Sequence, residues 1–285
     1  MKKTVILCTA FIACTMLTTS CSKSSETQSQ TTEKKAKKAK KADKDVFFYT
    51  AQHRKDKFVP TSPVIGFTDK ILDIKAEEFK GNENIREIIV PKHIEHIAES
   101  AFEGCTNLET IHFAGEMKVI NDNAFAGCTS LKKLMVDTWT VGLSSFEGCT
   151  SLEEVRFGDH MWWIRANAFA GCTSLKSILM GITLEKLEDD AFAGCKAVEE
   201  FSVPQAMKNR MFGYFADCPN VKKVYILSTE FFPVPKNCTP KASTTIYVPD
   251  AFLAQFQGDA GWSKFGEILP LSKSKYFADN GFWKK

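Results

Sequence analysis

A phrase of about eight residues recurs through the middle of this chain and constrains its fold more than any other feature. Each copy is a variant of AFAGCTSL, with a phenylalanine three residues before a cysteine. Successive copies stand 23 residues apart, with a single step of 21 between Phe125 and Phe146. One repeat of this length cannot bury its own apolar side, so the pattern predicts a solenoid of stacked coils. The phenylalanines are Phe79, Phe102, Phe125, Phe146, Phe169, Phe192 and Phe215, and the cysteines are Cys105, Cys128, Cys149, Cys172, Cys195 and Cys218.

Each repeat carries two short apolar segments. After the cysteine comes an alternating apolar pattern, as in CTNLETIHF, which is typical of a strand. A second apolar pair stands eight and five residues before the phenylalanine, as Ile94 and Ile97 stand before Phe102. The glycine of the AFxGC phrase, such as Gly104, suits a tight corner because it has no Cβ. We therefore expect two inward-facing segments in every coil.

The phrase AFAGCTSLKSI and its copies resemble the BspA-like leucine-rich repeats of bacterial surface proteins. The resemblance covers about residues 71–271, and TIYVPDAFLAQFQGDAGWSKFGEILPL looks like the closing segment of that family. Three features depart from the pattern: Asn82 replaces the first cysteine, one spacing is two residues short, and Arg210 replaces an apolar residue. The resemblance implies a right-handed, mostly β solenoid with short 3-10 or helical turns, one parallel sheet face and a 23-residue period.

The sequence predicts six segments. They are a lipoprotein signal peptide (1–20), a lipidated cysteine with a Lys/Ser-rich disordered tether (21–45), an N-terminal cap (46–70), a solenoid of about seven repeats (71–242), a C-terminal capping repeat (243–271) and a tail (272–285). The tail is expected to cover the last coil or to form a short contact segment.

The first 21 residues indicate export. Lys2 and Lys3 precede the apolar run VILCTAFIACTML, which is shorter than a membrane-crossing helix and is followed by small residues. The phrase LTTSC resembles a bacterial lipobox, in which Cys21 is acylated and becomes the new first residue. The alternative is a plain signal peptidase site with an incidental cysteine. Lipidation predicts a durable membrane anchor, because two fatty chains already suffice for stable attachment.

The basic charge of the chain is concentrated near its start. Residues 22–45 hold eight lysines against four carboxylates, and residues 46–285 carry a net charge near −3. This distribution argues against a nucleic-acid partner for the solenoid. The favoured interpretation of residues 22–45 is a solvated spacer, and the alternative is contact with anionic headgroups or cell-wall polymer.

The cysteine pattern predicts a buried ladder of free thiols. Six of the cysteines occupy one repeat position, where cysteine acts as a small buried hydrophobe. Their side chains would run parallel into one core row, and this arrangement does not suit disulfide geometry. Cys238 then remains as the odd thiol.

No active-site motif is recognisable in the chain. The histidines are scattered, and the pair His93 and His96 flanks an apolar position without a third ligand, which favours surface histidines over a metal pair. The sequence contains no GxSxG, HExxH or phosphate-binding glycine loop. We expect no catalytic residue, no bound metal and no cofactor.

The outward positions of the predicted strands form a candidate binding face, because stacked strands present a broad, rigid surface. Its residues are His112, Lys133, Met135, Glu154, Arg156, Leu179, Ser202, Lys223 and Tyr225.

A second candidate surface contains three tryptophans. Trp139 and Trp162 both stand seven residues before the repeat phenylalanine, and Trp163 lies beside them. Exposed aromatic groups are enriched at interaction hot spots and stack on sugar rings. The alternative is that the short spacing turns these side chains inward to fill a gap.

These features together predict an exported, non-enzymatic lipoprotein of the outer membrane that faces the cell surface or the periplasm. The resemblance implies binding of a protein partner, such as extracellular matrix or a cell-surface protein, and hence adhesion. One alternative is capture of a glycan or mucin through the tryptophan pair. Another is a structural role in the envelope or cell wall.

Overall fold

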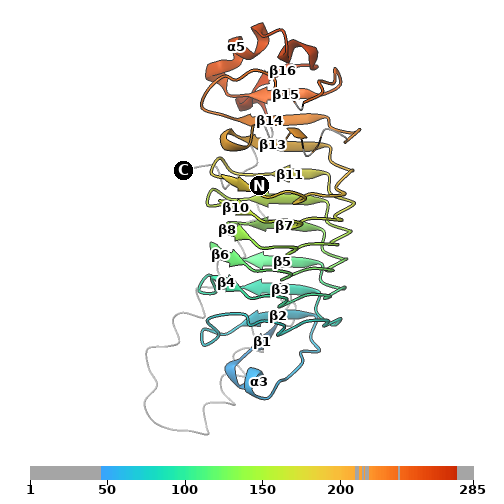
Figure 1. Ribbon diagram of the computed structural model, residues 1–285. Coiled ribbons are helices and arrows are strands. Elements are labelled where there is room, and N and C mark those ends of the chain that lie inside the picture. Colours follow the sequence, from blue (N-terminus) through green and yellow to red (C-terminus); the bar gives the residue numbers. More distant parts are fainter. Residues whose placement is uncertain (1–45, 209–211, 214, 216–217, 237, 275–285) are drawn as a thin grey trace, which may run out of the picture. The chain divides into compact units, whose positions relative to one another are not determined.

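The structure is a computed structural model that describes residues 46–208, 212–213, 215, 218–236 and 238–274 (Figure 1). The signal peptide, Cys21 and the tether predicted above lie outside the described residues, as do Arg210 and residues 275–285. Residues Asp45–Lys285 belong to one compact unit. Within this unit the strands pair in parallel from coil to coil, which confirms a parallel solenoid with a spacing of about 23 residues.

The strand after each cysteine joins a long ladder of parallel strands, which is divided into a four-stranded and a seven-stranded sheet. The first sheet contains β1 (Phe47–Tyr49), β2 (Val64–Phe67), β3 (Glu87–Val90) and β5 (Thr110–Phe113). The second contains β7 (Lys133–Val136), β9 (Glu154–Phe157), β11 (Ser177–Leu179), β13 (Glu200–Pro204), β14 (Lys223–Leu227), β15 (Thr245–Val248) and β16 (Ile268–Pro270). We call the two together the long sheet, because β5 and β7 are neighbours across the division.

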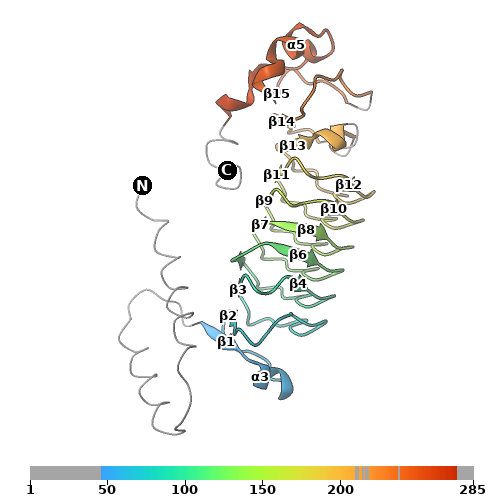
Figure 2. The ribbon, with the colours of Figure 1, turned by 90° about the vertical axis from the view of Figure 1, so that its left-hand side faces the viewer.

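The apolar pair before each phenylalanine forms strands as well. These strands are β4 (His96–Ile97), β6 (Met117–Ile120), β8 (Thr138–Val141), β10 (Trp163–Ile164) and β12 (Lys186–Leu187). They pair in parallel as a five-stranded sheet, here called the second sheet, which follows a different side of the stack from the long sheet (Figure 2). The sequence predicted two inward-facing segments per coil but only one sheet face. The structure shows that both segments hydrogen-bond to their neighbours.

The core contains two columns that run along the stack. The rings of Phe79, Phe102, Phe125, Phe146, Phe169 and Phe192 are stacked in sequence, with centroids 5.0–5.3 Å apart and planes within 9° of each other. Beside them each cysteine thiol donates to a carbonyl of the preceding coil, as Cys128 Sγ does to Phe102 O at 3.3 Å. All six thiols are buried and free of disulfides. The regular stacking ends at Phe215, whose ring is tilted by 52° against Phe192.

The AFxGC corner is a third line of contact between coils. Gly104 has a φ of +71°, a conformation that favours glycine, and its α-carbon lies against Gly81, because a Cβ on Gly104 would stand 3.7 Å from Gly81 Cα. Phe102 N donates to Ala124 O at 2.8 Å. The corner therefore ties successive coils together through the backbone.

The shortened repeat has its two missing residues at the corner between β7 and β8. Only Asp137 connects these strands, whereas residues 114–116 connect β5 and β6. The Asp137 carboxylate accepts from His160 N at 3.1 Å and lies 2.8 Å from His160 Nδ1. It also packs over Gly158, since a Cβ at Gly158 would stand 2.3 Å from Asp137 Cγ. Asp137 thus fills part of the space that the longer corners occupy with backbone.

The N-terminal end of the solenoid is closed by β1, β2 and helix α3 (Ala51–Lys55). Arg54 anchors this segment through Glu78 at 2.6 Å and Asp73 at 3.1 Å. At the cysteine position of the first coil, Asn82 donates to Pro60 O at 3.0 Å and accepts from Asn84 N at 2.9 Å. Asparagine suits this position because its amide can pair with backbone groups of the cap and of its own coil, where a thiol would pair with only one.

Among the described residues, most of the helical turns lie at the C-terminal end. They are η1 (Gln205–Met207), η2 (Asp250–Phe252), α5 (Leu253–Gly258), η3 (Trp262–Lys264) and η4 (Leu271–Lys273). Trp262 and Phe256 are fully buried here, and Trp262 Nε1 donates to Phe232 O at 2.8 Å. These aromatic side chains close the end of the core.

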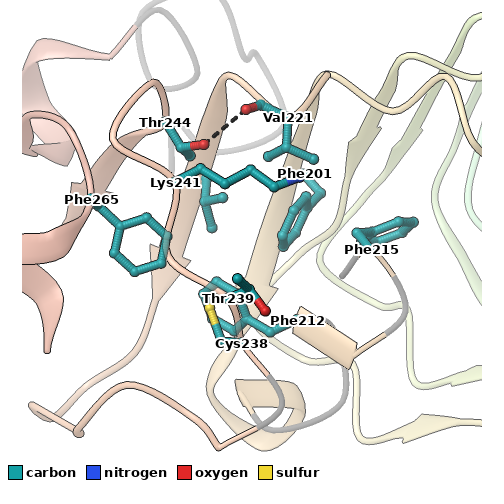
Figure 3. A pocket seen from close by; sticks show the side chains of 10 residues that line it. Phe201, Phe212, Phe215, Val221, Cys238, Thr239, Lys241, Thr244 and Phe265 are labelled. Carbon is teal, nitrogen blue, oxygen red and sulfur yellow. Dashed lines mark hydrogen bonds between the residues drawn. The ribbon is translucent and has the colours of Figure 1, made fainter. Parts of the chain in front are cut away.

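A small cavity of about 30 Å³ lies between the last repeat and this C-terminal end (Figure 3). Phe201, Phe212 and Phe265 line it, and Lys241 crosses it to donate to Cys218 O at 2.5 Å. A volume of this size admits water but no organic ligand.

Candidate functional site

Six of the nine residues of the candidate binding face are accessible on the long sheet. His112, Lys133, Met135 and Lys223 are exposed, whereas Glu154 and Arg156 are half-buried. Most of them contact one another or a neighbouring strand. Lys133 Nζ lies 3.0 Å from Glu154, and Arg156 pairs with the same carboxylate. Burial acts to raise the pKa of Glu154, but the hydrogen bonds from Lys133 and Arg156 outweigh it and hold this pKa below its usual value.

The prediction that Leu179, Ser202 and Tyr225 form part of an open face is wrong. Leu179 and Tyr225 are each only 4% exposed and form a small hydrophobic cluster with Leu227 and Leu271. Ser202 is fully buried, and its hydroxyl accepts from Met180 N at 2.7 Å and donates to Met180 O at 3.2 Å. The outward side chains of the long sheet are therefore buried at several positions towards its C-terminal end.

The three tryptophans lie on the outer side of the second sheet, and we call Trp139, Trp162 and Trp163 the Trp patch. Trp139 is 50% exposed and Trp162 is 39% exposed, whereas Trp163 is half-buried. The first two are neighbours in the stack, because Trp162 N donates to Trp139 O at 2.9 Å. The alternative in which the short repeat turns these side chains inward does not hold for Trp139 and Trp162.

Every indole N–H of the Trp patch donates to a carboxylate. Trp162 Nε1 donates to Glu185 and Trp163 Nε1 donates to Glu188, each at 3.0 Å. Trp139 Nε1 donates to Glu116. The indole rings are thereby held in fixed orientations on the sheet, and each of the three indole N–H groups has a partner.

A lysine occupies the space beside two of the rings. Lys186 Nζ lies 4.6 Å from the ring centroid of Trp162 and 5.0 Å from that of Trp163. The two rings are themselves in edge contact, with centroids 5.9 Å apart and planes at 77°. This arrangement is a cation–π contact in which one ammonium serves two indoles.

An open groove of about 620 Å³ borders the patch, where the second sheet ends at β12. Trp163, Lys186, Glu188, Asp189 and Met207 contribute to its walls. The groove is therefore lined by aromatic, acidic, basic and apolar side chains together.

The family of the chain follows from its repeats. The sequence profile described as "BspA type Leucine rich repeat region" matches six copies, over residues 63–138 and 133–238. The chain belongs to the BspA-type leucine-rich-repeat family. Proteins of this family are surface proteins.

Solved structures similar to this BspA-type protein include a leucine-rich-repeat protein of T. pallidum, with 16% identity, coverage of 85% of this chain and 91% of that chain, and a TM-score of 0.42. A leucine-rich cell surface protein of Faecalibacterium prausnitzii is 14% identical, with coverage of 84% and 86% and a TM-score of 0.36. The pneumococcal vaccine antigen PcpA is 16% identical, with coverage of 74% and 79% and a TM-score of 0.33. A search among curated proteins found no match.

The histidines and cysteines of this BspA-type protein do not form a reactive site in the part that the structure describes. His93 contacts Ile71 O at 3.0 Å, and no group of three potential metal ligands occurs among the described residues. Burial raises the pKa of Cys105 to about 12 and that of Cys238 to about 11. These groups are therefore thiols rather than thiolates at neutral pH, and thiols are poor nucleophiles.

Sequence reasoning missed the carboxylates and the lysine that surround the indoles. Glu185 stands at the same repeat position as Trp162 one coil later, and Lys186 likewise follows Trp163. Alignment of the outward positions along the stack would have placed these side chains next to each other. Glu116 and Trp139 are also 23 residues apart, but the short corner shifts the strand register, so that Met117 pairs with Thr138 and Lys118 rather than Glu116 stands opposite Trp139.

Proposed function

We propose that this protein is a non-enzymatic, lipid-anchored surface protein that binds a protein partner through the Trp patch. The observation that carries this proposal is the exposure of Trp139 and Trp162 on a sheet whose coils are fixed by stacked rings and backbone hydrogen bonds. Exposed tryptophans on a rigid surface lose little conformational entropy on binding, and tryptophan is enriched at binding hot spots.

The proposed location of the protein at the cell surface rests on two observations. The family consists of surface proteins, and the start of the chain has the pattern of an exported lipoprotein with Cys21 as the acylated residue. Within the described residues no helix combines the length and apolar composition that a membrane crossing requires. Lipid attachment at Cys21 to the outer membrane would leave the solenoid available to partners, and adhesion to host matrix or to other cells is the role that follows.

The test is binding of the chain from Ser22 onward to an array of matrix proteins, cell-surface proteins and glycans. The double variant Trp139→Ala/Trp162→Ala is compared with the control variant Met135→Ala, which removes an exposed apolar side chain from the long sheet. A protein ligand that is lost only in the tryptophan variant supports the proposal. A ligand retained in full by that variant contradicts it.

Capture of a glycan is a second candidate, and one observation favours it. Trp139 presents an exposed ring, and the carboxylate of Glu116 lies at its edge, a combination that can stack on a sugar and accept from its hydroxyls. Saturable binding of an array glycan that disappears in the tryptophan variant, without any protein ligand, would favour this candidate over the first.

A further inference from the structure

We propose that Trp139 and its carboxylates form a receptor for a lysine or arginine side chain of the partner protein. This inference rests on the proposed function and specifies the chemistry of the partner as a protein segment with exposed basic residues. Four observations support it: the acidic surroundings, a contact inside the protein that shows the same chemistry, the open ring of Trp139 and the fixed orientation of that ring.

The outer side of the second sheet has an excess of carboxylates around the indoles. Lys118 pairs with Glu95 at 2.6 Å and Arg165 pairs with Asp122 at 2.7 Å, so these charges balance one another. The carboxylates in contact with the Trp patch or its corner are then Glu116, Asp137, Glu185 and Glu188. Lys186 stands among them, and His160 contacts Asp137 and Glu116. A positively charged ligand is attracted to such a surface, and an anionic glycan is repelled.

The contact of Lys186 with the indoles is an example, within the protein, of the chemistry that we propose for the ligand. Its ammonium group lies over Trp162 and Trp163, whose indole N–H groups donate to Glu185 and Glu188. The ring faces attract the cation, and the carboxylates add their negative charge nearby. The protein thus already uses an indole with a carboxylate on its N–H to hold a lysine.

Trp139 shares the pairing of an indole N–H with a carboxylate, but its partner Glu116 belongs to the preceding coil, whereas Glu185 belongs to the coil after Trp162. Half of the surface of Trp139 is exposed. In the part of the chain that the structure describes, the cation–π contacts lie at Trp162, Trp163 and Phe232, and none lies at Trp139. The repeat position of Lys186 is filled by Trp163 in the coil after Trp139, so a basic side chain from another molecule can contact the exposed surface of Trp139 itself.

The backbone and the ring of Trp139 are already held in place without a ligand. Trp139 lies within β8, and Trp162 of the next coil donates its backbone N–H to Trp139 O. The indole ring is oriented by Glu116, so binding does not have to order a mobile ring. Occupation of the Trp162 and Trp163 rings by Lys186 leaves Trp139 as a single free platform, which suits one side chain better than an extended row of stacked sugars.

The experiment is calorimetric titration of the chain from Ser22 onward with an acetylated peptide of alternating lysine and serine, and with its arginine and glutamate counterparts. The unit Asp45–Lys285 is titrated in parallel, so that the lysines of residues 22–44 do not compete with the peptide. We expect the lysine and arginine peptides to bind and the glutamate peptide not to bind. Binding should weaken as the salt concentration rises from about 0.05 to about 0.5 M, because exposed charges are screened.

The variants distinguish specific binding at Trp139 from non-specific electrostatic attraction of the peptide. Trp139→Ala should weaken binding of the lysine peptide by roughly two- to thirtyfold, the range of cation–π contacts, and Trp139→Phe should restore part of it. Glu116→Gln should weaken it as well, and Met135→Ala should leave it unchanged. Circular dichroism of each variant confirms that the fold is retained.

Two results would overturn the inference. If Trp139→Ala binds the lysine peptide as well as the parent protein while Glu116→Gln does not, the attraction is general electrostatics without a ring site. If the lysine peptide does not bind but an array ligand is still lost in Trp139→Ala/Trp162→Ala, the Trp patch binds another chemistry, such as a glycan, and the proposed binding role stands without this inference. If the lysine peptide does not bind and no array ligand is lost in Trp139→Ala/Trp162→Ala, both proposals are contradicted.

Discussion

The long sheet and the second sheet differ in which of their outward side chains stay accessible to a partner. On the long sheet most polar outward side chains contact neighbouring coils: Tyr225 donates to Glu200 at 2.9 Å, and Ser177 donates to the same carboxylate at 2.8 Å. On the second sheet Trp139 and Trp162 remain exposed, although their N–H groups are satisfied. Both sheets belong to the same coils, so the difference lies in the outward residues alone.

This comparison indicates how a repeat fold separates stability from recognition. A charged or hydroxyl side chain finds a partner on the next strand, about 4.8 Å along the stack. Its hydrogen-bonding groups are then satisfied within the protein and are not available to a ligand. An indole satisfies its N–H in this way, and at Trp139 the ring stays open to a ligand, whereas Lys186 occupies the rings of Trp162 and Trp163. The inward positions serve both sheets equally, so changes there should affect both, and outward changes should affect one.

The largest expected effect concerns the cysteine column, which both sheets share. Burial raises the pKa of Cys105, Cys149 and Cys195 to about 12, so the native state holds their protons and the unfolded chain releases them above about pH 9. The contribution of these protonated thiols to the free energy of unfolding is complete below pH 9 and is lost as the pH rises towards 12. At pH 10 the loss is about 1 kcal/mol for each thiol.

Urea unfolding at pH 8 and pH 10 measures this effect, and the midpoint should fall at pH 10. The matched control is Cys149→Ala, which should be less stable at pH 8 and should lose less on the change to pH 10. Rapid alkylation of the native protein at pH 8 by iodoacetamide, at the six repeat cysteines, would contradict buried thiols.

The next effect concerns the phenylalanine column. Phe146 is fully buried, with its ring 5.2 Å from that of Phe125 and 5.3 Å from that of Phe169. Phe146→Ala should lower the free energy of unfolding by about 3–5 kcal/mol, because it removes a large side chain and leaves a cavity. Thermal unfolding checks this, with Trp139→Ala as the control on an exposed aromatic residue. Equal losses in the two variants would remove the distinction between inward and outward positions.

A smaller effect tests the short corner that precedes Trp139. Gly158→Ala would place a Cβ 2.3 Å from Asp137 Cγ, and the overlap should cost about 1–3 kcal/mol of stability. The double variant Asp137→Gly/Gly158→Ala removes the overlapping carboxylate and should recover part of the loss. If the double variant is less stable than the sum of the two single variants predicts, the contact between these residues is not the cause.

The smallest effect concerns the ion pairs of the long sheet. Lys133→Ala removes a pair whose lysine is exposed, and it should change the free energy of unfolding by less than about 1 kcal/mol. It should also leave partner binding unchanged. A binding loss in this variant as large as that of Trp139→Ala would move the recognition surface to the long sheet.

The sequence predicts the inward positions well because they repeat. The phenylalanine and cysteine columns recur at one spacing, and stacking places equivalent residues next to each other. The outward positions are harder to predict. Alternation indicates on which side of a strand Leu179 and Tyr225 lie, but not that Leu271 of a later segment packs against them.

The site shows the same limit. The common repeat position of Trp139 and Trp162 is visible in the sequence, whereas the position of Glu116 at the Trp139 indole depends on the corner that Asp137 shortens. A change of two residues in loop length alters which outward side chains meet, and periodicity does not report it.

The most direct test of the account is the affinity of a captured partner for two double variants, one on each sheet. Surface plasmon resonance compares Trp139→Ala/Trp162→Ala with Lys133→Ala/Met135→Ala, after thermal unfolding has shown that both are folded. We predict a loss of at least about tenfold, or about 1.4 kcal/mol, for the tryptophan pair and no significant loss for the long-sheet pair. A larger loss for the long-sheet pair would contradict the assignment of recognition to the second sheet.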